Sequence, residues 1–472
     1  MKRLVALIML IMLFAVSVSA GCVPLPPTDT SNGAVSSAVS DAVSGSETSP
    51  EESLEEPSLG AVSTAVIGSS GDILIHNGVR KSAYVSETGE YDFSYCFEYL
   101  SDYVQSVDYS VVNIEFSVSA DGSYASLPFR VPASVVKALA ETGYDLGITA
   151  NNHIQDGGIT GIKKTINTLT EFGMDHTGTV LDSSEDRYLI RDINGIKIGF
   201  VNYSYGGYWN TNCFSTDNLE AFYADIAGLI SDMRGDGAEL IYLYIHWGAE
   251  YSLSQNTTQD EIAMKMCELG VDVIIGGHPH KVQPVELIES ANGNTAICLY
   301  STGNLLSGQQ IECMAGGTRA NSPNCFQDSW HFAGCDWPDV ADRTQDTHRL
   351  EHGVNCNDNG HTEDGVLFYT TVTRYEDGTV MVSSVDVLPV WCMGRGLVRA
   401  SYPTNSYFEE YILVPLDTTI DWRETFGLTD AEYTEAQYSY DRTEAQLSEG
   451  INEVNDYLTG VYEALNEKYL SK

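Results

Sequence analysis

From about residue 61 onward, short runs of apolar residues alternate with segments in which apolar residues recur at helical spacing. Residues 240–245 are typical of a buried strand, and residues 161–172 place apolar side chains on one face of a helix. This alternation is typical of α/β proteins, in which helices cover sheets. We therefore predict an α/β fold, with an antiparallel pair of strands within 365–388 and a mostly helical C-terminal extension at 396–472.

Acidic residues, asparagines and histidines directly follow several predicted strands, at the end where ligands bind in open α/β sheets. A semi-buried imidazole without a partner is costly, so several histidines at one sheet edge suggest a shared cation. Mixed nitrogen and oxygen ligands favour manganese, iron or zinc over calcium. The alternative is a hydrogen-bonded histidine cluster in a sugar- or peptide-binding cleft. The candidates at predicted strand ends are Asp72, Glu115, Asn152, His153, His246, His278 and His280.

The order of these motifs resembles that of the CapA family of poly-γ-glutamate capsule-biosynthesis proteins. The resemblance covers about residues 61–395, interrupted by the insertion at about 308–364, and each motif lies at the end of a predicted strand. The resemblance implies a calcineurin-like metallophosphoesterase fold, a two-sheet sandwich flanked by helices, with one or two divalent ions. The six motifs are Gly71-Asp72, Asn113-Ile114-Glu115, Asn151-Asn152-His153, His246-Trp247-Gly248, Gly277-His278-Pro279-His280 and Gly303-Asn304.

The resemblance also implies a role for each matching residue. His153 would be the catalytic acid, which protonates a leaving group or steadies a developing negative charge. Asn152, beside it, would act in catalysis as a ligand of the second ion. Two neighbouring ions would lower the pKa of a shared water and hold both oxygens of an in-line displacement. The implied ligands are Asp72 and His280 at the first ion, Glu115 near the bridging position, and Asn152, His246 and His278 at the second.

The first strand region departs from the phosphoesterase pattern. It is expected as two strands, at 61–67 and 73–75, with a bend at Gly71-Asp72. Phosphoesterases carry Asp-x-His here, whereas Asp72 is followed by Ile73-Leu74, and the nearest histidine is His76. The first metal site is therefore expected to be weaker, or the protein to hold one ion or none. His76 is either a relocated ligand or a solvated side chain, and we expect the second.

For function, the resemblance implies a protein of capsule or surface-polymer biosynthesis with a hydrolase-like metal site. Its expected partners are the anionic polymer, poly-γ-glutamate, or the proteins that make it. Two alternatives stay open: an envelope lipoprotein that binds polymer without catalysis, and a metallophosphatase of small phosphate esters. The missing Asp-x-His disfavours the phosphatase.

The chain is strongly acidic, with 24 lysines and arginines against 66 aspartates and glutamates and a net charge of -42. It has no block of basic residues that would neutralise phosphates, so we expect no nucleic-acid partner. The charge also disfavours electrostatic capture of a polyanion, except at a local metal site. A polyglutamate ligand therefore conflicts with the overall charge.

The N-terminus is typical of a bacterial lipoprotein signal. Two basic residues precede an apolar stretch at 4–18 that is too short to span a membrane. Small residues then lead directly to Cys22, where a lipoprotein would be cleaved and diacylated. We predict a signal peptide at 1–21 and a flexible, lipid-anchored stalk at 22–60. The protein would then lie on the extracytoplasmic face of the cell membrane, and secretion after ordinary cleavage is the alternative.

The ten cysteines fall into separate groups. Cys267 and Cys298 lie among apolar residues, so we predict buried free thiols there. Four others lie in a polar insertion at about 308–364, where an oxidising compartment favours disulfides. A zinc site formed with nearby histidines is the alternative. The insertion contains the disulfide candidates Cys313, Cys325, Cys335 and Cys356, together with His331, His348, His352 and His361.

Overall fold

The computed structural model describes residues 58–126, 128–309, 362–399 and 406–471. Residues Leu59–Lys472 form one compact unit. The predicted signal peptide, Cys22 and nearly all of the predicted stalk lie outside the described residues, as do the four disulfide candidates and the four histidines of the insertion. Within the described ranges, no helix combines the length and the apolar character needed to cross a bilayer.

The first sheet contains eight strands, in the order β20 (Ser406–Pro415), β19 (Val380–Arg399), β18 (Asp364–Tyr375), β1 (Ala61–Leu74), β4 (Tyr109–Asn113), β8 (Leu146–Ile148) and β9 (Asp175–Thr177), with β17 (Asn304–Ser307) paired to β1 off this path. Strands β1, β4 and β8 are parallel. Their carboxyl ends therefore lie at one edge of the sheet. On its other side, β1 pairs antiparallel with β18 and then parallel with β17.

The second sheet has the order β10 (Leu189–Ile193), β11 (Ile196–Tyr205), β13 (Leu240–His246), β14 (Val273–Gly277), β16 (Thr295–Leu299) and β15 (Val285–Glu289), with β12 (Cys213–Phe214) paired to β11. The four strands from β11 to β16 are parallel, and β10 and β15 are antiparallel at the edges. The carboxyl ends of β13 and β14 therefore also lie together.

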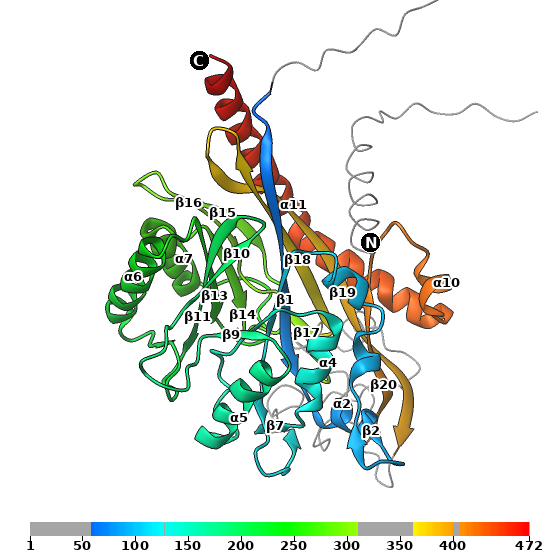
Figure 1. Cartoon of the computed structure of the whole chain (residues 1–472). Helices are drawn as coiled ribbons and strands as arrows, with labels where there is room; N and C mark the ends of the chain where they lie inside the picture. The colour runs from blue at the N-terminus through cyan, green and yellow to red at the C-terminus, as the bar shows by residue number, and fades with distance from the viewer. Residues whose placement is uncertain (1–57, 127, 310–361, 400–405, 472) are drawn as a thin grey trace, which may run out of the picture. The chain divides into compact units, whose positions relative to one another are not determined.

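The two sheets pack face to face, and helices cover their outer sides (Figure 1). The core between the sheets contains Ile67 and Phe368 from the first sheet, and Ile198 and Tyr242 from the second. A second core lies between the first sheet and its helices, and a third between the second sheet and its helices. This is the α/β two-sheet sandwich that the sequence predicts. Cys267 and Cys298 are buried and free, as predicted.

Helices α4 and α5 lie along the first sheet, and helices α6 and α7 cover the second. Helix α7 begins with a capping box, in which Asn256 and Gln259 satisfy each other's backbone N–H groups. The helices are α2 (Asn77–Ser82), η1 (Ser94–Phe97), α3 (Ser101–Val104), α4 (Ser134–Thr142), α5 (Gly158–Glu171), α6 (Leu219–Gly235), α7 (Thr257–Leu269), α10 (Trp422–Phe426) and α11 (Asp430–Leu470). Two small sheets join β2 (Tyr84–Val85) to β3 (Glu90–Tyr91), and β5 (Ser117–Val118) to β7 (Phe129–Val131) and β6 (Ala125–Ser126).

Strand β1 runs without a break through Gly71 and Asp72, so the prediction of two strands and a bend is wrong. The strand continues because β18 and β17 pair with it in succession. A shift in register at Asp72/Ile73, typical of a β-bulge, takes the place of the bend. A glycine is required at position 71 because the backbone there lies very close to that of Gly303. A Cβ at this position would lie 2.2 Å from the carbonyl oxygen of Gly303.

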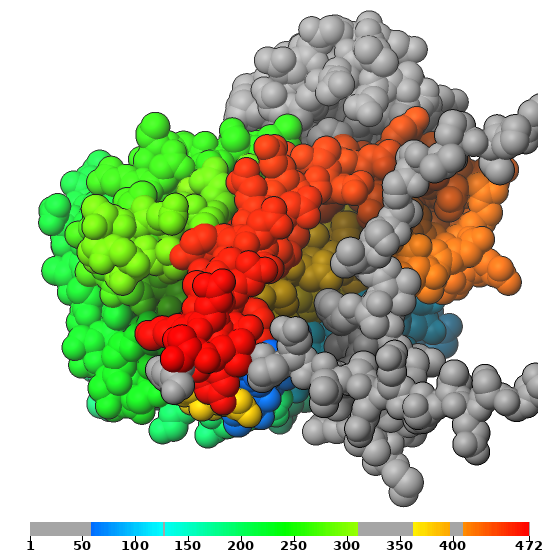
Figure 2. Space-filling model, turned by 90° about the horizontal axis from the view of Figure 1, so that it is seen from above, coloured from blue at the N-terminus to red at the C-terminus, as the bar shows by residue number. Residues whose placement is uncertain are grey.

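The first sheet also continues past residue 395, because β19 extends to Arg399 and β20 pairs with it. After β20 the chain forms α11, a helix of 41 residues that begins with a capping box of Thr429 and Glu432. Leu447 and Val454 on this helix join the core between the two sheets. Figure 2 shows α11 lying between the green residues of the second sheet and the gold strands of the first.

Candidate metal centre

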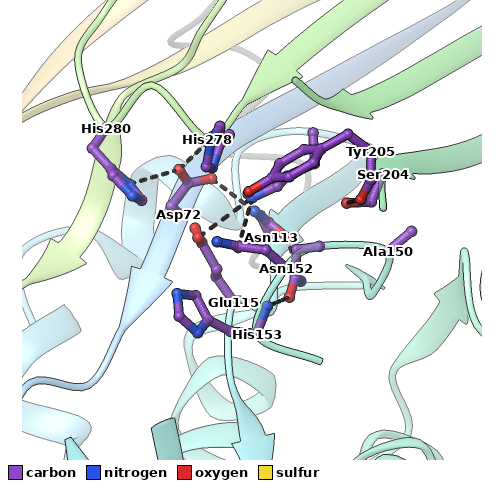
Figure 3. Close-up of polar contacts among 12 residues, drawn as sticks. Asp72, Asn113, Glu115, Ala150, Asn152, His153, Ser204, Tyr205, His278 and His280 are labelled. Atoms are coloured by element: carbon purple, nitrogen blue, oxygen red, sulfur yellow. Dashed lines mark hydrogen bonds and ion pairs between the residues drawn. The ribbon is translucent and has the colours of Figure 1, made fainter. Parts of the chain in front are cut away.

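Strands β1, β4, β13 and β14 deliver the candidate ligands to one edge of the sandwich. Figure 3 shows Asp72, Glu115, His278 and His280 close together there. Asp72 lies near the end of β1, and Glu115 lies two residues after β4. His246 is the last residue of β13, while His278 and His280 lie just past the end of β14. All five residues are at most 4% exposed. The predicted ligands therefore meet in the interior of the molecule and not on separate faces.

The ligand atoms form two overlapping groups around Glu115. One group contains Asp72, Glu115 and His246, and the other contains Glu115, His278 and His280. Within each group the possible ligand atoms lie within 4.8 Å of one another. Glu115 is therefore the residue that the two groups share. The pairing of the histidines differs from the one implied by the resemblance, although Nδ1 of His280 also lies 3.4 Å from Oδ2 of Asp72.

Four buried atoms of this cluster have no hydrogen-bond partner within the described part of the chain. They are both carboxylate oxygens of Glu115 and the Nδ1 atoms of His246 and His278. An unsatisfied buried polar atom costs about 1–3 kcal/mol, and more if it is charged. Folded proteins satisfy nearly all such atoms. Carboxylate oxygens and imidazole nitrogens that converge without partners fit a divalent cation of the manganese, iron or zinc type.

Burial shifts the protonation of these side chains strongly. Burial raises the pKa of Glu115 well above its usual value, and the Asp72 carboxylate raises it further. Burial lowers the pKa of His246 to about 3, and it also holds the pKa of His278 well below its usual value. Both histidines are therefore neutral near pH 7, which is the form that binds a metal. A cation at this place would favour the ionised form of Glu115.

Asp72 is held by donors on three sides. Nδ2 of Asn113 donates to Oδ1 at 2.7 Å, and the backbone N–H of His278 donates to Oδ2 at 3.2 Å. Burial alone would raise the pKa of Asp72, but a hydrogen bond with His280 and the nearby His246 outweigh it and lower the pKa. Asp72 is thus ionised and fixed in orientation before any ion binds.

The loop after β14 has a constrained backbone. His278 and His280 have φ of 94° and 57°, values that residues other than glycine rarely adopt. Such a conformation costs about 1–3 kcal/mol at each residue and persists only where the surroundings impose it. Gly277, just before them, packs against the carboxylate, since a Cβ there would lie 2.9 Å from Oδ1 of Asp72. The backbone is therefore arranged to bring two imidazoles beside Asp72.

Asn152 and His153 lie in the loop between β8 and α5. Oδ1 of Asn152 is 3.0 Å from Nε2 of His246, so the carboxamide reaches the ligand cluster. Nδ1 of His153 is 2.8 Å from Oδ2 of Asp156, which also accepts a hydrogen bond from the backbone N–H of Phe129 at 2.5 Å. The His153 side chain is 16% exposed. A carboxylate thus orients an imidazole that reaches solvent, an arrangement that suits proton transfer.

His76 is only 3% exposed, so the prediction of a solvated side chain is wrong. Its ring lies edge-on to Phe129 at 5.0 Å, and its Nδ1 is 3.4 Å from Oγ of Ser307. His76 belongs to neither ligand group found among the described residues. Leu74, which takes the histidine position of Asp-x-His, is buried in the apolar core. The usual third residue of that motif is therefore replaced by a packing residue.

Tyr205, at the end of β11, is a site residue for which the sequence gives little signal. Its ring is nearly parallel to that of His246, with centroids 6.2 Å apart, and lies 4.8 Å from the ring of His278. Figure 3 shows its hydroxyl directed toward the ligand cluster. Its place at a strand end could have indicated it. Trp247, in contrast, is 1% exposed and donates its indole N–H to the carbonyl of Tyr300, so it is a core residue.

Several solved structures resemble this chain at low sequence identity. A calcineurin-like phosphoesterase, YfkN from Bacillus subtilis, is 14% identical with a TM-score of 0.35, and the match covers 81% of this chain and all of that one. A phosphatase from Mycoplasma pneumoniae is 14% identical with a TM-score of 0.37, over 69% of this chain and 93% of that one. These scores are low, so the fold class rests on the two sheets described above.

Relatives with known names are found among bacterial capsule proteins. The "PGA biosynthesis protein CapA" of Bacillus subtilis is 28% identical over 269 residues, which are 54% of this chain and 67% of that protein. The "Capsule biosynthesis protein CapA" of Bacillus anthracis is 27% identical over 252 residues, 51% of this chain and 59% of that protein. A "Probable polyglutamine synthesis accessory protein" of Mycobacterium tuberculosis is 23% identical over 203 residues, 38% of this chain and 52% of that protein.

A protein-family match covers the segment that contains the cluster. The family is described as "Bacterial capsule synthesis protein PGA_cap", and its model matches residues 66–309. This segment includes all the candidate ligands, from Asp72 to His280, and just over half of the 472 residues. The chain therefore belongs to the PGA_cap family of bacterial capsule synthesis proteins.

Proposed function

We propose that this protein acts in the synthesis of poly-γ-glutamate or a related capsule polymer through a metal-dependent, hydrolase-like site. The observation that carries the proposal is the cluster of four unsatisfied ligand atoms on Glu115, His246 and His278. Family membership supports the polymer, and the buried cluster supports the metal. The substrate and the reaction are inferred from these two observations together.

The site would hold one or two divalent ions, of manganese, iron or zinc. A bound ion supplies a Lewis acid and a water of lowered pKa. Asn113 fixes the Asp72 carboxylate, and the strained loop after β14 fixes two of the imidazoles. The residues that would bind the ions are Asp72, Glu115, Asn152, His246, His278 and His280.

His153 would be the general acid, which donates a proton to the leaving group of the reaction. Asp156 engages Nδ1 of His153, which leaves Nε2 as the ring nitrogen that gains or loses a proton. The same carboxylate holds the ring in one orientation, as a proton-transfer group needs. Since His153 is partly exposed beside a buried cluster, its proton can be replaced from solvent.

The overall charge bears on how an anionic polymer would bind. With a net charge of -42, the protein surface repels polyglutamate at long range. A divalent ion at Glu115 would provide local positive charge that could attract a polymer carboxylate. We therefore propose that the polymer contacts the protein at the metal centre, and that other proteins of polymer synthesis deliver it there.

We further propose that the protein is anchored through Cys22 on the extracytoplasmic face of the membrane. The basic residues, the apolar stretch at 4–18 and the small residues before Cys22 support this location. Labelling of cells with a radioactive fatty acid would test it, with Cys22→Ser as the control. An unlabelled wild-type protein in the culture medium would show secretion instead.

Hydrolysis assays test the proposed activity. Full-length protein purified in detergent and saturated with manganese should cleave bis(p-nitrophenyl) phosphate or shorten poly-γ-glutamate. His153→Ala and His278→Ala should lose about 100-fold or more in rate. His176→Ala, which removes a histidine outside both ligand groups, should retain activity.

Different outcomes separate the candidate functions. Bound manganese without cleavage of the ester or the polymer would favour a protein that binds polymer and passes it on. Cleavage of small phosphate monoesters alone would favour a metallophosphatase. Unchanged activity in both His153→Ala and His278→Ala would contradict the proposed site.

A further inference from the structure

Helix α11 lies beyond the segment that the family match covers, yet its polar residues contact loops beside the metal centre. We propose that Arg442 and Gln446 are positioning residues, which hold the two chain segments that flank His280. This inference rests on the proposed metal site, and it assigns α11 a task there in addition to its packing between the sheets.

Arg442 makes a two-pronged contact with the start of β18. Its Nε and Nη2 each donate to a carboxylate oxygen of Asp364 at 2.8 Å, and Nη2 donates to Glu363 at 3.3 Å. Ser439, one turn earlier, donates to the same Asp364 at 2.6 Å. The two carboxylate side chains are 8% and 5% exposed, so water screens the contact little. Two parallel hydrogen bonds of this kind fix both the position and the orientation of the Asp364 carboxylate.

The chain just before Asp364 reaches the ligand cluster through Asn304. Nδ2 of Asn304 donates to the carbonyl of Thr362 at 2.8 Å. Oδ1 of the same Asn304 lies 3.1 Å from Nδ1 of His280. Arg442 therefore fixes the chain at residues 363–364, and with it the neighbouring carbonyl of Thr362. That carbonyl orients the Asn304 side chain, which in turn orients the imidazole of His280. Partners that orient a metal ligand in this way affect metal affinity.

Gln446 makes the second contact, one turn after Arg442 and on the same face of the helix. Its Nε2 donates to the carbonyl of Leu253 at 2.7 Å, in the loop after β13. In that loop the backbone N–H of Tyr251 donates to the carbonyl of Pro279 at 2.8 Å. The Tyr251 ring lies 6.0 Å from that of His280. The loop therefore supports the strained backbone on the other side of His280.

The same helix offers a matched control far along its length. Asn455 receives a hydrogen bond from the backbone N–H of Val385 on β19 and donates to the carbonyl of the same residue, both at 2.9 Å. Asn455 thus anchors α11 through two hydrogen bonds, to a position of β19 that pairs with Thr370 in the middle of β18. Loss of Asn455 should lower stability without changing the metal centre.

Manganese affinity of the full-length protein, measured by calorimetry in detergent, tests the proposal. Arg442→Met should weaken binding about tenfold, the lower end of the effect of outer ligand partners. Gln446→Ala should weaken it less, and Arg442→Lys should restore part of the loss. Asn455→Leu should bind manganese as tightly as the wild type. Hydrogen exchange of the metal-free protein gives a second readout, in which Arg442→Met should speed exchange at residues 276–281.

Wild-type affinity in Arg442→Met, with unchanged exchange at 276–281, would overturn the inference and leave the metal site standing. An equal loss of affinity in Asn455→Leu would also overturn it, because the effect would then reflect general stability. A wild-type protein that binds no divalent ion would overturn both this inference and the proposed function.

Discussion

The Glu115 carboxylate lies 3.5 Å from Nε2 of His246, and both side chains are buried, yet neither Glu115 oxygen accepts a hydrogen bond within the described residues. A carboxylate buried in this way lowers stability unless something neutralises it. The Glu115 side chain cannot readily move away from this position, because β4 is paired with parallel strands on both sides. One of them, β1, carries Asp72. We interpret the relationship as that of two ligands of one ion.

Replacing Glu115 by glutamine should therefore have opposite effects with and without metal. In chelator at pH 8, we expect Glu115→Gln to be more stable than the wild type by about 1–3 kcal/mol, because no unpaired buried carboxylate has to be maintained. With manganese present the order should reverse, since the wild type alone gains stability from binding. Urea unfolding measures both differences. A variant less stable than the wild type in chelator would contradict this account of Glu115.

Two glycines allow a test of the close packing at Asp72. Gly277→Ala should weaken manganese binding, because its Cβ would lie 2.9 Å from Oδ1 of Asp72 and must displace that carboxylate. Gly228→Ala, in α6, has open space and should stabilise the protein by up to about 1 kcal/mol without changing metal affinity. Calorimetry and urea unfolding of the two variants give the comparison. Equal metal affinity in both would show that the approach of Gly277 to Asp72 is unimportant.

The buried His76 should make stability depend on pH. Burial lowers its pKa to about 3 in the folded protein, below the unfolded value of 6.5. The folded state therefore binds fewer protons than the unfolded state between these values, so the His76 contribution to stability is lost as pH falls below 6.5. Relative to His76→Gln, the wild type should lose about 2 kcal/mol between pH 7 and pH 5. Urea unfolding at each pH measures the free energy of unfolding of both proteins. If this free energy fell equally with pH in the wild type and in His76→Gln, the account of a neutral, buried His76 would be contradicted.

Tyr205 should affect catalysis more than metal binding. Tyr205→Phe keeps the ring that lies against His246 and His278, so manganese affinity should be unchanged. Loss of the hydroxyl should lower kcat/KM about tenfold, the worth of one hydrogen bond to a bound substrate. Steady-state kinetics on whichever substrate the wild type cleaves would check this. An unchanged kcat/KM would show that the hydroxyl does not contact the substrate.

Much of the His/Asp/Glu cluster could be predicted from the sequence, because its side chains follow strands whose apolar pattern is local. His246 and the pair His278 and His280 come directly after such runs. The continuity of β1 through Asp72 could not be predicted, since it depends on pairing with β17 and β18, far along the chain.

Burial of His76 also escaped prediction, because the residues that cover it are distant in sequence. Phe129 and Ser307 pack on it from other parts of the fold. The contact of Arg442 with Asp364 is similar: a helical pattern identifies α11 but not the loop that it meets. Local patterns therefore predict which side chains reach the sheet edge, and long-range packing decides how they are held.

Elemental analysis of the purified full-length protein tests the central claim most directly. After loading with manganese and removal of free metal, the wild type should retain one or two ions per chain. The double variant Asp72→Asn with His278→Ala, which disrupts both ligand groups, should retain almost none while keeping its fold by circular dichroism. A folded wild-type protein that retains no stoichiometric manganese, iron or zinc would contradict the claim that these strand ends form a metal centre.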